Sequence, residues 1–294
     1  MIFIVFDSRN LIYQARLEGK GNMIGFFDSG FGGLTVLRSV VRELPEYTYL
    51  YLGDSARVPY GERSPEVVYG CTVQAVEFLL KKGCLLVVVA CNTVSSGALR
   101  RIQQEFLPDA YPGRRVLGVV RPSAEEIADR GCRTVGILAT EGVVKSKIYT
   151  EELEHLNTPV KIFYQACPFL VPIIEAGGQD DTHSDVVVSE YLNGLFAQED
   201  SIDTILLACT HYPILYDAFR RHTPDHVEII TQGPIIARKL KDYLSRHVEI
   251  REGLSRKGGR SFFSTGSPEK FNRFASLFYG EGIQSMQVTL GLPD

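Results

Sequence analysis

Residues 85–93 read Leu-Leu-Val-Val-Val-Ala-Cys-Asn-Thr, an unbroken apolar run that ends at a thiol, an amide and a hydroxyl. Apolar runs without alternation are typical of strands that are buried on both faces of a parallel sheet. Residues 204–211 repeat the pattern, because Thr-Ile-Leu-Leu-Ala is followed by Cys-Thr-His. Both segments therefore predict a buried strand with a cysteine at its carboxyl end.

Short apolar runs and helical patterns alternate along the rest of the chain. Apolar residues recur at helical spacing over residues 34–44 and again from about Pro65 to Gly83. This alternation favours an α/β fold in which mainly parallel sheets are flanked by helices. Strands are predicted at residues 24–27, 47–52, 85–90, 116–120, 134–139, 160–163, 204–208 and 227–230.

A faint internal repeat divides the chain into two similar, pseudo-symmetric domains. Residues 24–30 resemble residues 135–141, and the segment around Cys91 resembles the segment around Cys209. Each half then carries a cysteine at the sheet edge where open α/β sheets bind ligands. We expect an N-terminal extension (1–22), a first α/β domain (23–117), a second (118–228) and a C-terminal segment (229–294) that returns to the first domain.

Composition and charge exclude several classes of function. The net charge of −4 gives no reason to expect nucleic-acid binding, which usually needs a basic domain. The apolar start Met1–Phe6 is too short for a signal peptide or a membrane span. The cysteines form no Cys-x-x-Cys pair, which indicates reduced thiols of a cytoplasmic protein and no metal site. They are Cys71, Cys84, Cys91, Cys132, Cys167 and Cys209.

Cys91 and Cys209 are the strongest candidates for chemistry. At a strand-to-helix turn, free backbone N–H groups and the helix dipole favour an anion, which would lower the pKa of a thiol. The alternative is that both are buried core cysteines, which is the commoner fate of a free cysteine. Two cysteines in matched positions, each followed by polar groups, favour the first interpretation. The other four cysteines lack this context and are assigned a structural role.

Further polar residues surround these two cysteines in the predicted topology. Asp28 heads the turn Asp-Ser-Gly-Phe-Gly-Gly, which fits no phosphate loop and would instead orient or accept a proton. The alternative is a helix-capping aspartate. His211 follows Cys209 by two residues, although a lone histidine is more often structural. Glu175 lies in an apolar stretch, so partial burial with a raised pKa competes with plain surface exposure.

Four segments carry a resemblance to the glutamate racemases of the aspartate/glutamate racemase superfamily. The segments are Asp28–Thr35, Pro59–Gly61, Ala90–Thr93 and Ala208–Pro213, and Ala166–Pro168 leading to Glu175 is a softer fifth. They stand in the family's order over roughly residues 23–290. The chain departs from the family pattern at Ser123, because the residue after Pro122 is expected to be glycine. This departure bears on the hinge between the domains.

The resemblance implies an active site in the cleft between two similar α/β domains, often in a homodimer. It makes Cys91 and Cys209 the acid/base residues on opposite faces of the α-carbon of glutamate. Asp28 would support Cys91, whereas His211 and Glu175 would support Cys209. The substrate's ammonium and carboxylate groups would be held by Asp28, Ser29, Tyr60, Gly61, Asn92, Thr93, Thr210 and His211.

The implied activity is racemisation of L-glutamate to D-glutamate by two cysteines, supplying D-glutamate for peptidoglycan synthesis. One thiolate removes the α-proton while the other thiol delivers one, so that no cofactor and no metal is expected. Two alternatives stay open. One is a racemase or isomerase of the same superfamily that acts on aspartate or another small acid, and the other is a protein that binds an amino acid without turning it over.

Overall fold

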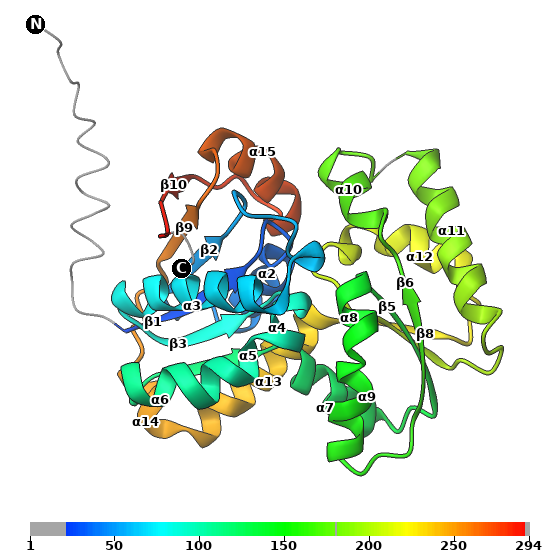
Figure 1. The fold of residues 1–294 in the computed structure, drawn as a ribbon, viewed down its shortest axis with the longest axis horizontal. Helices are drawn as coiled ribbons and strands as arrows, with labels where there is room; N and C mark the ends of the chain where they lie inside the picture. Colours follow the sequence, from blue (N-terminus) through cyan, green and yellow to red (C-terminus); the bar gives the residue numbers. More distant parts are fainter. Residues whose placement is uncertain (1–21, 180, 292–294) are drawn as a thin grey trace, which may run out of the picture.

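Two parallel sheets, each flanked by helices, make up the computed structural model of the protein (Figure 1). The structure describes residues 22–179 and 181–291. Of the predicted N-terminal extension, only Asn22 lies within the described residues. The prediction of an α/β fold built from two similar parallel-sheet units is confirmed.

The first sheet has six strands within the described part of the chain, and every neighbouring pair is parallel. Their order is β10-β9-β2-β1-β3-β4. The strands from the N-terminal half are β1 (Met23–Asp28), β2 (Tyr49–Gly53), β3 (Cys84–Val89) and β4 (Arg115–Gly118). The C-terminal segment adds β9 (Arg260–Ser264) beside β2 and β10 (Ser285–Gln287) beside β9.

The second sheet has the order β6-β5-β7-β8 and is also parallel throughout. Its strands are β5 (Thr134–Ala139), β6 (Lys161–Ala166), β7 (Thr204–Leu207) and β8 (Glu228–Thr231). The order β2-β1-β3-β4 in the first sheet corresponds to β6-β5-β7-β8 in the second. The repeat seen in the sequence therefore reflects a repeated topology, in which β3 and β7 precede the two candidate cysteines.

Helices cover both faces of the first sheet. Alternate residues of β1 and β3 pack into two separate apolar clusters, one shared with α3 and the other with α2, α13 and α15. Because both faces are covered, β3 is apolar along its whole length. These helices are α2 (Leu34–Glu43), α3 (Pro65–Lys81), α13 (Gln232–Arg246) and α15 (Pro268–Tyr279).

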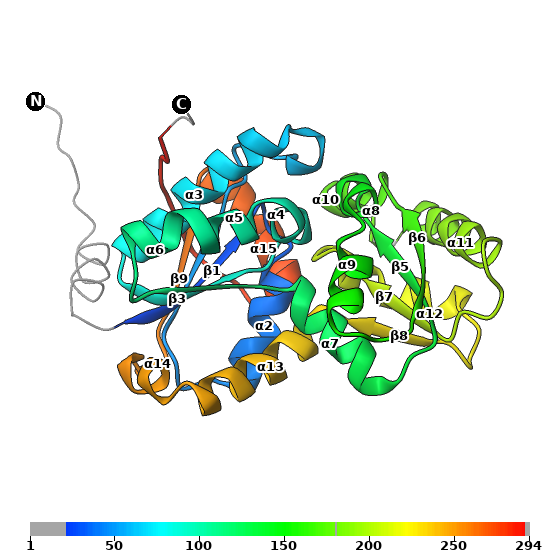
Figure 2. The same cartoon turned by 60° about the horizontal axis from the view of Figure 1, so that its bottom comes forward.

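The remaining helices join the strands of the two sheets (Figure 2). In the first half they are η1 (Tyr60–Glu62), α4 (Asn92–Gly97), α5 (Leu99–Arg101), η2 (Ile102–Phe106) and α6 (Leu107–Ala110). In the second half they are α7 (Val120–Arg130), α8 (Glu141–Ser146), α9 (Ile148–His155), α10 (Leu170–Glu175), α11 (Thr182–Phe196), η3 (Tyr212–Leu215) and α12 (Tyr216–His222). The helix α14 (Val248–Gly253) follows α13. None of the helices in the described residues is long and apolar enough to cross a membrane.

The sequence predicts two strand ends wrongly. The strand predicted at residues 160–163 continues as β6 to Ala166, and the other error lies near the junction of the two sheets. The strand predicted at residues 116–120 ends at Gly118, and Val120 begins α7. Pro122 lies in the first turn of α7. Backbone N–H groups in a first turn have no partner within the helix, so the missing N–H of proline costs no hydrogen bond there. The predicted boundary after residue 228 falls inside β8. The division into domains stays a prediction.

Candidate active site

Cys91 and Cys209 both lie just beyond the carboxyl end of a buried parallel strand. Cys91 follows β3 and precedes the first residue of α4, with its backbone in an extended conformation. Cys209 follows β7 by two residues and precedes η3 by three. Both side chains are 7% exposed. The matched strands thus bring two thiols from two sheets to the same kind of position.

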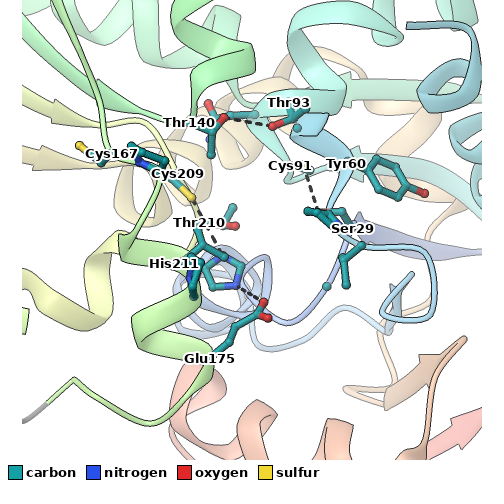
Figure 3. Close-up of a pocket in the computed structure, with 18 of the residues that line it drawn as sticks. Ser29, Tyr60, Cys91, Thr93, Thr140, Cys167, Glu175, Cys209, Thr210 and His211 are labelled. Carbon is teal, nitrogen blue, oxygen red and sulfur yellow. Dashed lines mark hydrogen bonds and ion pairs between the residues drawn. The ribbon is translucent and has the colours of Figure 1, made fainter. Parts of the chain in front are cut away.

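One cavity of about 600 Å³ connects the two cysteines. It lies between the halves of the molecule, with the loop of Cys91 on one side and the loop of Cys209 on the other (Figure 3). Carboxyl ends of parallel strands are where open α/β folds bind ligands. All the predicted site residues line this cavity except Asp28; they are Ser29, Tyr60, Gly61, Cys91, Asn92, Thr93, Glu175, Cys209, Thr210 and His211.

Asp28 lies at the end of β1, behind the wall of the cavity, and is 1% exposed. Its Oδ2 accepts a hydrogen bond from the backbone N–H of Gly30 (2.9 Å). The N-cap of α2 is Gly33, so Asp28 does not cap that helix. A Cβ atom on Gly33 would lie 2.6 Å from Cβ of Asp28, which explains why the turn needs glycine there.

The electrostatic surroundings of Cys91 differ from the sequence prediction. Burial raises the pKa of its thiol to about 12, and the charge of Asp28 adds to this. Burial likewise raises the pKa of Asp28, while His211 opposes the shift. The expectation that the turn lowers the pKa of this cysteine is therefore wrong. Desolvation and a buried carboxyl group outweigh the N-terminus of the short helix α4.

Cys209 has a cationic partner. His211 Nδ1 lies 4.0 Å from Sγ of Cys209, and His211 Nε2 lies 3.0 Å from Oε1 of Glu175. Burial lowers the pKa of His211, but its contacts with Cys209 and Glu175 outweigh burial and raise it to about 10. His211 is therefore an imidazolium at neutral pH. A cation beside a sulfur stabilises the thiolate, the form that removes protons.

The turn after β1 and the first residues of α2 reach across to the turn that carries Cys209. Oγ1 of Thr35 donates to the backbone carbonyl of Thr210 (2.9 Å). A Cβ atom on Gly32 would lie 2.3 Å from Oγ1 of Thr210 and 2.5 Å from Nδ1 of His211. Glycine at this position thus lets the two sheets approach closely at the site.

The loop with Tyr60 and Gly61 closes one side of the cavity. The hydroxyl of Tyr60 donates to Asp54, a carboxylate that is fully buried and also pairs with Arg57 (2.7 Å). Thr265 Oγ1 donates to the other oxygen of Asp54 (2.7 Å). The tyrosine hydroxyl is therefore occupied, so Tyr60 presents its ring and backbone to the cavity.

Two threonines meet across the cavity. Oγ1 of Thr93, which follows the first cysteine by two residues, lies 3.3 Å from Oγ1 of Thr140, the N-cap residue of α8 (Figure 3). Ser29 Oγ lies 3.5 Å from Sγ of Cys91. Hydroxyl groups therefore line the space between the thiols, and such groups can donate hydrogen bonds to a carboxylate.

Several further residues that were not predicted as site residues line the same cavity. Cys167, which was assigned a structural role, lies in its wall, and its thiol points to the carbonyl of Gln165 (3.6 Å). Lys270 approaches from α15, a helix far away in the sequence. The remaining missed residues are Gly30, Val58, Pro59, Thr140, Glu141, Pro168, Val171, Pro172, Ala176 and Ala208. Among the described residues, no group of three or more His, Cys, Asp or Glu side chains could hold a metal ion.

Known proteins with similar sequences and structures fit this geometry. The model of the Asp/Glu/Hydantoin racemase family matches residues 24–240. A glutamate racemase from Geobacter metallireducens is 37% identical over 270 residues, covering 91% of this chain and 96% of that protein.

Two solved structures are similar over the same extent. A glutamate racemase from Bacillus anthracis superposes with a TM-score of 0.82 and 32% identity, covering 92% of this chain and 98% of that one. A glutamate racemase from Francisella tularensis, solved in complex with D-glutamate, has a TM-score of 0.81 and 26% identity at the same coverage. Family match, sequence identity and fold agree across both sheets, and this chain belongs to the Asp/Glu/Hydantoin racemase family.

Proposed function

We propose that the protein interconverts L- and D-glutamate without a cofactor, with Cys91 and Cys209 as the two residues that transfer the α-proton. The observation that carries the proposal is the pair of thiols at matched strand ends, on opposite sides of one cavity. Racemisation needs a proton removed from one face of the α-carbon and a proton delivered to the other. Two thiols facing one substrate from opposite sides supply both groups.

The different surroundings of the two thiols support a division of roles. The pKa of about 12 keeps Cys91 protonated at neutral pH, which is the form that delivers a proton. The imidazolium of His211 lies 4.0 Å from the sulfur of Cys209, where its positive charge is placed to balance a negative charge. L-glutamate would then lose its α-proton to Cys209 and gain one from Cys91. In the reverse direction the two residues exchange roles.

The negative charge that develops on the substrate carboxylate needs fixed donors. Asn92, Thr93 and Thr210 line the cavity beside the two thiols, and Asn92 and Thr93 offer an amide and a hydroxyl as donors, whereas the hydroxyl of Thr210 donates to Oδ1 of Asp28 (3.5 Å). Donors that are already oriented stabilise this charge without reorganising during the reaction. The cavity is bounded by residues from both sheets, so that water would be displaced when the substrate enters.

Glutamate is the proposed substrate because the relatives named above are glutamate racemases and one of them was solved with D-glutamate. The test is to incubate the purified protein with L-glutamate, without added cofactor, and to follow optical rotation and chiral composition. We expect a higher kcat/KM for glutamate than for aspartate. An equal or higher value for aspartate would instead support the alternative of another racemase of this family. Recovery of L-glutamate unchanged would support a binding protein.

The cellular setting is proposed on the family resemblance. We expect a homodimer in the cytoplasm that supplies D-glutamate for peptidoglycan synthesis. Sedimentation of the purified protein tests the dimer. Loss of growth on depletion of the protein, rescued by added D-glutamate, tests the role in peptidoglycan synthesis.

A further inference from the structure

Asn92, the residue after Cys91, is held by a buried junction of four polar side chains. Asn92 bonds directly to Tyr149 of α9 and Gln232 of α13, and Gln232 in turn bonds to Ser123 of α7. Asn92 is 4% exposed, Gln232 is 2% exposed, and the other two side chains are fully buried. The junction joins helices that follow strands of both sheets, and it lies directly behind the wall of the cavity that Asn92 lines.

Hydrogen bonds run through the junction without a break. Nδ2 of Asn92 donates to Oε1 of Gln232 (2.6 Å), and the Tyr149 hydroxyl donates to Oδ1 of Asn92 (2.7 Å). Nε2 of Gln232 donates to the Tyr149 hydroxyl (2.9 Å) and to Oγ of Ser123 (3.0 Å). Buried polar groups that lose such partners are costly, so the four side chains constrain one another.

Ser123 determines which way both amides point. Its hydroxyl has one proton, and that proton is donated to the carbonyl of Val119 (2.7 Å). Oγ of Ser123 can therefore only accept from Gln232, so the nitrogen of that amide must face the serine. The oxygen of Gln232 then accepts from Nδ2 of Asn92, and Nε2 of Gln232 donates to Oδ1 of Asn92 (3.1 Å), so the two amides are paired in one orientation. Ser123 thus fixes the orientation of Asn92 through one intermediate side chain.

We propose that Ser123 and Gln232 are positioning residues that hold the Asn92 amide with an N–H group available to the substrate's carboxylate. An asparagine amide has two N–H groups, and one is used by Gln232. The inference rests on the proposed function, in which the substrate carries a carboxylate beside Cys91. In the reversed orientation Asn92 would present an oxygen, which repels a carboxylate.

Ser123 stands where the family resemblance predicted a glycine, and glycine has no hydroxyl with which to orient Gln232. The departure that the sequence analysis assigned to the hinge therefore acts on the residue next to the first cysteine.

The test compares Ser123→Ala with Ser184→Ala. Both serines are buried, and both donate to a backbone carbonyl at 2.7 Å, but only Ser123 accepts from an amide of the junction. We measure kcat and KM for glutamate, and the Kd of D-glutamate by calorimetry. Ser123→Ala is expected to raise KM and Kd roughly three- to tenfold, the size that one buried hydrogen bond supports, with kcat changed less than about twofold. Ser184→Ala should leave all three unchanged.

A double-mutant cycle separates positioning from a general effect on the fold. Partial unfolding lowers kcat per mole of protein without changing KM. Because Ser123 acts through Asn92, Ser123→Ala should cause no further rise in KM or Kd when it is added to Asn92→Ala. Gln232→Met keeps the length of the side chain but removes the amide that joins Ser123 to Asn92, so it tests the same link. This variant also keeps the test possible if Ser123→Ala fails to fold.

Three results would overturn the inference: unchanged KM and Kd in Ser123→Ala, an equal rise in the Asn92→Ala background, or Asn92→Ala binding like the wild type. A wild-type protein that binds D-glutamate but leaves its chirality unchanged would overturn the proposed function instead. The calorimetric comparison would still decide the role of Ser123.

Discussion

The ion pair between Glu175 and His211 supports Cys209, and Glu175→Gln removes its charge while keeping a hydrogen-bond acceptor of the same shape. The two side chains are 3.0 Å apart. At that distance, unit charges attract by about 5 kcal/mol at an effective dielectric constant of roughly 20. Glu175 is 29% exposed, so that water weakens this attraction. Neutralising a close carboxylate typically lowers the pKa of a partner by about 1–3 units, and we expect the pKa of His211 to fall from about 10 to roughly 8.

The expected consequence is an earlier loss of activity at alkaline pH. In the wild type, His211 stays cationic until the pH approaches about 10. In Glu175→Gln, kcat/KM for L-glutamate should begin to fall roughly two pH units lower. Circular dichroism of the substrate, followed from pH 6 to pH 11, measures both profiles. Glu141→Gln is the matched control, because Glu141 lines the same cavity but pairs with Lys145 (3.1 Å).

The pair also contributes to stability over a defined pH window. A histidine whose pKa is raised on folding stabilises the folded state fully below its unfolded value near 6.5, and this contribution is lost as the pH rises through about 10. Urea unfolding should therefore show a larger difference between wild type and Glu175→Gln at pH 6 than at pH 10. Two results together would refute the cationic role of His211. One is that kcat/KM of Glu175→Gln falls at the same alkaline pH as that of the wild type, and the other is that the two proteins differ equally in stability at pH 6 and pH 10.

Three other substitutions give distinct outcomes. Tyr60→Phe should change KM for glutamate less than about twofold but lower the free energy of unfolding by about 1–3 kcal/mol, because the buried carboxylate of Asp54 loses one of its three hydrogen-bond donors and keeps only Arg57 and Thr265; a large rise in KM with unchanged stability would contradict this. Asp28→Asn should let Cys91 ionise at lower pH, since it removes the nearby charge, and the pH dependence of alkylation at Cys91 measures this; an unchanged alkylation profile would argue against it. Gly32→Ala should destabilise the fold by about 1–3 kcal/mol in urea unfolding and abolish activity, because its methyl group would overlap the turn that carries the second thiol, and wild-type stability would show that the turn can yield.

The positions of both thiols could be predicted because they depend on local patterns. An unbroken apolar run followed by a cysteine indicates a strand end, and the repeat indicates that two such ends are equivalent. The structure places Cys91 after β3 and Cys209 after β7, in corresponding strands of the two sheets. Strand ends within a residue or two could not be fixed in this way, as the start of α7 at Val120 shows.

The electrostatics of the site could not be predicted, because they depend on residues distant in sequence. The pKa of Cys91 is raised by burial and by Asp28, which lies 63 positions earlier on another strand. His211 is buried because Phe278 of α15 packs edge-on against its ring, with centroids 5.1 Å apart. Gln232 shows no motif in the sequence, and only the fold brings it to Asn92, 140 residues away.

Exchange of the α-proton in single-cysteine variants tests the central claim, that two thiols act on opposite faces of the substrate. The measurement is loss of the α-proton NMR signal of pure L- and pure D-glutamate in D₂O, with chiral analysis of the product. Cys91→Ala and Cys209→Ala should both be nearly inactive as racemases, because a methyl group cannot transfer a proton. Residual exchange should favour L-glutamate in Cys91→Ala, where Cys209 remains, and D-glutamate in Cys209→Ala. Racemisation by either variant at a near wild-type rate would contradict the account.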